Sequence, residues 1–191
     1  MKLFCNLLTD CLNEPKASRK TELLQIYFQN ESIENLPIAL HLLIGKNFGR
    51  FCSGKVLREW CSEKLSLPLW LIDETYESLG DNSETIALCY SKNIASKSWD
   101  LYELCATMLL LKRSDINEKK QWIIDCWTHL PSNEIYVFNK LLGGGIRIGA
   151  SKKIVLKALS KAVSVSHETL EQRLLGNWIP SVDFYESLIN L

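Results

Sequence analysis

Hydrophobic residues recur along this chain at spacings of three and four almost from end to end, and the alternation typical of β-strands is rare. Such spacing places apolar side chains on one face of an α-helix. The pattern predicts about a dozen helices, over residues 2–12, 19–30, 34–44, 54–65, 69–79, 83–93, 98–112, 116–130, 133–142, 151–164, 167–175 and 181–190.

Residues that favour helix ends lie between these segments. The predicted N-caps are Asp81, Ser98, Asp115 and Ser181, whose side-chain oxygens can accept hydrogen bonds from the first amides of a helix. Gly45, Gly80 and Gly176 stand where helices are expected to stop. No repeat at the period of a helical solenoid and no long linker interrupts this organisation.

The predicted fold class is therefore all-α, a single compact multi-helix domain spanning residues 1–191. The loop at Lys46–Gly54 is the connection that could separate an N-terminal subdomain, but the continuous helical pattern favours one body. A chain of this length that is 47% hydrophobic can bury a core without disulfides or metals.

Cysteine usage and apolar runs restrict the cellular setting. The seven cysteines are widely spaced, with no Cys-x-x-Cys pair and no histidine at zinc-ligand spacing, so we expect neither a disulfide framework nor a metal site. Free thiols are typical of a reducing cytoplasm. The N-terminus lacks the features of a signal peptide and the apolar runs are too short to span a membrane, so no membrane partner is expected.

Charge is unevenly distributed although the formal net charge is zero. The segment from Ile135 to His167 contains no acidic residue. Its basic residues are Lys140, Arg147, Lys152, Lys153, Lys157 and Lys161. A neutral protein with one concentrated basic region indicates a defined anionic ligand.

A glycine-rich stretch, residues 143–153, lies within this basic segment. Its three consecutive glycines allow backbone conformations that bring the chain close to another molecule. If Ile146 and Ile148 point into the core, the alternation turns Arg147 outward. Ser151 can cap the next helix, whose first turn offers free amides and the positive end of a helix dipole to an anion.

The helix after this turn has one basic face and one apolar face. Lys153, Lys157 and Lys161 are four residues apart, which suits a surface that follows DNA phosphates. An equally good interpretation is an ordinary amphipathic helix with solvated lysines. A Walker A nucleotide loop is excluded because Ala150 stands where the phosphate-binding lysine belongs and no hydrophobic strand precedes the loop.

Other candidate sites are weaker. The turn from Gly80 to Thr85 reads as a helix stop followed by a capped helix start, and its amides could also hold a phosphate. The three histidines are too far apart in sequence for a metal site or a catalytic triad. The acidic residues Asp73, Glu74 and Glu77 fit a solvated helix face, and the six tryptophans fit a core. We find no catalytic constellation.

The segment from Asn139 to Leu159, with its Arg-x-Gly after a glycine turn, resembles the N-terminal domain of ATP-dependent DNA ligases, particularly bacterial ones. Residues 56–60, 74–85 and 173–184 are similar to the same family. The resemblance implies an all-helical domain that grips nicked duplex DNA through the minor groove and sugar-phosphate backbone. The residues expected to contact DNA are Lys140, Gly144, Gly145, Arg147, Gly149, Ser151, Lys152, Lys153, Lys157, Gly80 and Asp81.

One family feature is missing. ATP-dependent ligases attach AMP to the lysine of a Lys-x-Asp-Gly motif, and residues 1–191 contain none. The chain is then either a module of a longer ligase, which we favour, or a free-standing relative. We expect it to be inactive and to have no cofactor of its own, while ATP and Mg²⁺ serve the parent enzyme. The expected partners of this monomer are nicked duplex DNA and the adenylation and OB-fold domains of the same polypeptide, in the bacterial cytoplasm at the nucleoid. The alternative is a helical protein-interaction domain whose basic face meets an acidic partner.

Overall fold

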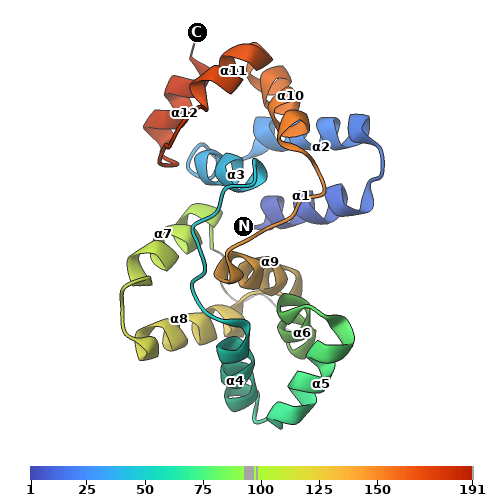
Figure 1. Cartoon of the computed structure of the whole chain (residues 1–191), viewed down its shortest axis with the longest axis vertical. Helices are drawn as coiled ribbons and strands as arrows, with labels where there is room; N and C mark the ends of the chain where they lie inside the picture. The colour runs from blue at the N-terminus through green and yellow to red at the C-terminus, as the bar shows by residue number, and fades with distance from the viewer. Residues whose placement is uncertain (93–96, 98, 191) are drawn as a thin grey trace. The chain divides into compact units, whose positions relative to one another are not determined.

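The structure, a computed structural model, describes residues 1–92, 97 and 99–190 (Figure 1). The all-α fold class is confirmed, since the described residues contain twelve helices and no strand. The helices are α1 (Lys2–Asn13), α2 (Ala17–Asn30), α3 (Leu36–Leu43), α4 (Gly54–Leu65), α5 (Leu69–Leu79), α6 (Asn82–Cys89), α7 (Leu101–Leu111), α8 (Ile116–His129), α9 (Ser132–Gly143), α10 (Lys152–Val163), α11 (His167–Arg173) and α12 (Val182–Ile189). Each corresponds to one predicted segment.

Helix ends follow the predicted capping chemistry. Asp81, Asp115 and Ser181 are the N-caps of α6, α8 and α12, and each side chain accepts a hydrogen bond from an amide in the first turn of its helix. The prediction that Ser98 is an N-cap lies outside the described residues. Gly80 is the C-cap of α5 in a left-handed conformation.

Close contacts group the chain into two compact units. The first unit comprises residues 1–46, 100–102 and those from 146 on, and the second comprises residues 47–99 and 103–145. Helices α1 to α3 and α10 to α12 form the first unit, and the second holds α4 to α6, most of α7, α8 and α9.

The first unit is organised around the packing of α10 against α2 (Figure 1). The buried residues of α10 are Val155, Leu156, Ala158 and Leu159, and those of α2 include Leu24 and Phe28. Every residue of α3 is buried, which its uniformly apolar sequence explains. The guanidinium of Arg173, in α11, donates to the carbonyls of Leu188 at 2.8 Å and Asn190 at 2.6 Å, and so closes the end of α12.

The second unit has its densest packing between α6 and α9. Trp127 of α8 is fully buried, and its indole N–H donates to Oδ1 of Asn139 in α9 at 2.9 Å. The hydroxyl of Ser132 donates to the carbonyl of Ala87 at 2.9 Å, which joins the start of α9 to α6. Close packing and the Ser132 hydrogen bond therefore join α9 to α6, and the Trp127 hydrogen bond joins α9 to α8.

All seven cysteines are free thiols, and six of them are buried. Among the described residues, no group of three or more His, Cys, Asp or Glu side chains is arranged to hold a metal ion. None of the helices there has the length and apolar character needed to cross a lipid bilayer.

One strained helix end provides a test of this fold. Ser164, the C-cap of α10, has a φ of 58°, which non-glycine residues adopt at a cost. Ser164→Gly should raise the free energy of unfolding by about 0.5–1 kcal/mol, because the relief of strain exceeds the added entropy of the unfolded chain. Urea denaturation followed by tryptophan fluorescence measures the change.

Ser160→Gly is the matched control, because Ser160 lies in the interior of the same helix. There the substitution should lower the free energy of unfolding by about 0.5 kcal/mol. The same sign of change at both positions would contradict the left-handed conformation of Ser164.

Candidate functional site

The residues predicted to contact a ligand lie on two surfaces, one in each unit. In the first unit, residues 146–152 form a turn that we call the Arg147 turn. With residues 42–45 it lines a depression of about 410 Å³. In the second unit, a hollow of about 440 Å³ lies between the start of α6 and the end of α9, and we call it the α6–α9 hollow.

The Arg147 turn has the predicted alternation. Ile148 is buried, Ile146 is half-buried, and Arg147 between them is exposed. Ser151 caps α10 by accepting a hydrogen bond from the amide of Ile154, as predicted. The first amides of α10 have no carbonyl partner within the helix and lie beside the turn.

Gly149 holds the turn in a conformation that other residues rarely adopt, with a φ of 63°. Its carbonyl accepts a hydrogen bond from the ammonium of Lys20, in α2. A Cβ at position 149 would lie 3.2 Å from that ammonium nitrogen. Lys20 therefore braces the turn and adds a positive charge to it. No pattern in the sequence indicates this contact, because Lys20 is a single lysine 129 residues away from Gly149.

The basic residues of α10 face outward. Lys152, Lys153 and Lys157 are exposed, and within the described chain neither they nor Arg147 form an ion pair. The opposite face of α10 packs on α2. The first unit therefore presents a row of uncompensated positive charge that begins at the Arg147 turn.

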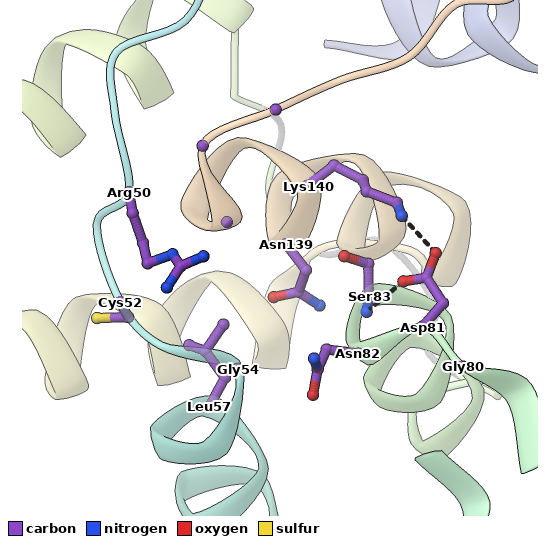
Figure 2. Close-up of a pocket in the computed structure, with 13 residues that line it drawn as sticks. Arg50, Cys52, Gly54, Leu57, Gly80, Asp81, Asn82, Ser83, Asn139 and Lys140 are labelled. Carbon is purple, nitrogen blue, oxygen red and sulfur yellow. Dashed lines mark hydrogen bonds and ion pairs between the residues drawn. The ribbon is translucent and has the colours of Figure 1, made fainter. Parts of the chain in front are cut away.

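The α6–α9 hollow brings together two segments that the sequence suggested separately. Its lining residues are Arg50, Cys52, Gly54, Leu57, Gly80, Asp81, Asn82, Ser83, Asn139, Lys140, Gly143, Gly144 and Gly145 (Figure 2). The predicted Gly80–Asp81 turn thus lies beside Lys140 and the glycines of the second predicted segment. No contact with a ligand was predicted for the side chains of Arg50, Asn82 and Asn139.

Because Gly144 has no side chain, another backbone segment of the protein can approach it closely. A Cβ there would lie 2.9 Å from the backbone nitrogen of Arg50. This close approach lets the amide of Phe51 donate to the carbonyl of Leu142 at 2.9 Å, at the end of α9. The loop before α4 is docked in this way, and it carries Arg50 to the rim of the hollow. At Gly143 and Gly145, by contrast, a Cβ would meet no atom within 4 Å.

Asp81 holds this surface together with both of its carboxylate oxygens (Figure 2). Oδ1 accepts from the amides of Ser83 at 2.8 Å and Glu84 at 3.3 Å, and Oδ2 accepts from the ammonium of Lys140. Partial burial opposes ionisation, but the Lys140 hydrogen bond and charge and the two amides outweigh it, so the pKa of Asp81 lies below its ordinary 3.8. Asp81 thus positions Lys140 and caps α6.

A comparison with known protein families matches most of the chain. A family model described as DNA ligase N terminus matches residues 1–160, a span that includes the Arg147 turn and all residues of the α6–α9 hollow. No curated protein gives a significant match to the chain.

The ion pair between Asp81 and Lys140 predicts a pH-dependent stability. Asp81→Asn keeps an N-cap acceptor but removes the charge, so it should lower the free energy of unfolding at neutral pH. A carboxyl whose pKa is lowered by folding stabilises the protein above its unfolded pKa, and the stabilisation is lost as the pH falls through the folded pKa. The difference between the two proteins should therefore shrink below pH 3.8, as measured by urea denaturation across pH.

Asp115→Asn is the control, since Asp115 caps α8 in the same manner and forms no ion pair in the described chain. We expect this substitution to lower stability less at neutral pH. Equal effects of the two substitutions would show that the ion pair between Asp81 and Lys140 contributes nothing to the stability of the fold.

Proposed function

The chain belongs to the DNA ligase N-terminus family, and we propose from that premise that it binds nicked duplex DNA independently of base sequence. The contacts are to the sugar-phosphate backbone and the minor groove. The chain acts in this proposal as the N-terminal module of an ATP-dependent ligase in DNA repair, recombination or replication.

The observation that carries the proposal is the uncompensated positive charge on the first unit. Arg147, Lys152 and Lys153 are exposed at the turn and at the start of α10, where helix geometry also exposes free amides. Guanidinium, ammonium and amide groups are the donors that proteins direct at DNA phosphates. Most of the binding free energy then comes from the release of counterions.

The residue types on the exposed face of α10 support binding without sequence preference. Direct reading of bases relies on bidentate pairs, such as arginine with guanine or asparagine with adenine, held in a groove. The exposed basic residues of α10 are lysines, and the helix contains no Asn, Gln or Arg. Lysine is a point charge on a flexible chain, which suits a phosphate better than a base edge.

The catalytic steps belong to other domains in this proposal. Residues 1–191 contain no Lys-x-Asp-Gly motif to receive AMP, so ATP and Mg²⁺ act in the adenylation and OB-fold domains of the same polypeptide. The module's contribution is to hold the duplex near those domains.

Binding to nicked duplex should weaken steeply with salt. The logarithm of the affinity is expected to fall with the logarithm of salt concentration by about 0.9 for each phosphate contacted. Four to six basic contacts give a slope of about −4 to −5. Fluorescence anisotropy with duplexes of unrelated sequence measures both the slope and the sequence preference. A slope near zero would favour a protein-interaction domain, and a strong preference for one sequence would contradict backbone binding.

Arg147→Ala should weaken binding to nicked duplex by about 1–3 kcal/mol, the free energy of a charge-assisted hydrogen bond to phosphate. Its folding should change by less than about 0.5 kcal/mol, because the side chain is exposed. Ile148→Asp should instead destabilise the protein, since it buries an unpaired charge. Thermal melts beside anisotropy titrations separate these effects.

Arg19→Ala is the matched control, because Arg19 is an exposed arginine of the same unit that already pairs with Glu22. We expect it to leave DNA affinity nearly unchanged. If Arg147→Ala binds DNA as well as the unsubstituted chain, or unfolds, the Arg147 turn is not the DNA contact.

A further inference from the structure

Asn139 presents a buried hydrogen-bond donor that no described residue satisfies. The residue is 2% exposed, and its Oδ1 accepts from the indole N–H of Trp127. An indole N–H can only donate, so this contact fixes the amide with Nδ2 as its free end. Nδ2 has no hydrogen-bond partner, yet Asn139 lines the α6–α9 hollow (Figure 2). A buried unsatisfied donor is costly, and an acceptor entering the hollow would satisfy it.

Asn82 supplies a second donor fixed in the same way. Its Oδ1 accepts from the guanidinium of Arg58, which also donates from Nε to Asp73 at 2.6 Å. The Nδ2 of Asn82 is thereby turned toward Gly54, where a Cβ would lie only 2.4 Å from it. Glycine at position 54 leaves room for this amide at the wall of the hollow.

The charges around the hollow are those of Arg50, Lys140 and Asp81. Arg50 is exposed, forms no ion pair in the described chain, and reaches over the hollow toward Asn139 (Figure 2). Asp81 is the carboxylate of the lining, and its oxygens are already bound to Lys140 and to the amides of α6. The hollow therefore carries net positive charge and donors that lack acceptors.

We propose that the α6–α9 hollow binds one phosphate group. Asn139 and Asn82 donate from their fixed amides to its oxygens, Arg50 closes over it, and Lys140 adds charge. The proposal rests on the proposed function, in which the phosphate is a phosphodiester of the duplex, contacted separately from the Arg147 turn. Donors without acceptors select an anion over a metal cation, and a tetrahedral phosphate offers oxygens in several directions at once.

The first test measures affinity for nicked duplex by fluorescence anisotropy across salt concentrations. Arg50→Gln should weaken binding about tenfold or more and reduce the magnitude of the salt slope by about 1. Asn139→Asp keeps the acceptor for Trp127 but replaces the free donor with a negative charge, so it should weaken binding further. Arg113→Gln is the control, because Arg113 is an exposed arginine of the same unit that forms no ion pair with any described residue and does not line the hollow. It should retain both affinity and slope.

The second test observes Asn139 directly. In protein labelled with ¹⁵N-asparagine, the side-chain amide signals of Asn139 and Asn82 should shift when nicked duplex is added. A separate titration with inorganic phosphate distinguishes the sources. Shifts with both ligands indicate a general phosphate site, whereas shifts with duplex alone indicate a phosphodiester site. Either result supports the proposal. Signals are assigned from the Asn139→Asp and Asn82→Asp proteins, and Arg50→Gln carries the binding test if Asn139→Asp does not fold.

The two proposals fail in different ways. If the unsubstituted chain does not bind nicked duplex, the proposed function is wrong. If it binds, but Arg50→Gln and Asn139→Asp bind equally well and the Asn139 signal does not move with either ligand, the hollow is not a phosphate site while the proposed function stands.

Discussion

The ends of helices leave backbone amides and carbonyls without partners, and the way this protein satisfies them links several helix ends to other segments. The carbonyl of Leu142, at the end of α9, receives the amide of Phe51, which fixes the loop before α4. Asp81 caps α6 and binds Lys140 with the same carboxylate. Arg173 closes the end of α12 from α11. Each of these contacts joins a helix end to a residue outside that helix.

The same requirement explains why both candidate surfaces lie at helix ends. Where the protein itself binds only some of the polar groups at a helix end, the remaining donors are available to an external ligand. At the Arg147 turn, Ser151 takes one amide of α10 and leaves exposed basic side chains around the rest. In the α6–α9 hollow, Trp127 fixes the oxygen of Asn139 and leaves its nitrogen free. Internal hydrogen bonds thus orient the groups that remain available.

Much of this organisation could be predicted from the sequence because it depends on neighbours in the chain. The spacing of apolar residues located each helix of the described residues, since helical periodicity is local. Asp81, Asp115 and Ser181 were identified as caps because a cap binds an amide two or three residues away. The outward position of Arg147 followed from its two flanking isoleucines. The resemblance to ligase N-terminal domains was likewise contained in the order of residues, and it is confirmed.

The sequence by itself therefore determined the helices, the caps at Asp81, Asp115, Ser151 and Ser181, the exposed arginine and the family of this protein. Only the tertiary structure decided which distant groups meet. Lys140 and Asp81 are 59 residues apart, and Lys20 lies 129 residues from the carbonyl it binds. Arg50 reaches the α6–α9 hollow because Gly144 admits the backbone of its loop. Such contacts depend on how the helices pack. The packing depends on the surface buried over a whole unit, so it cannot be predicted from a local pattern of residues.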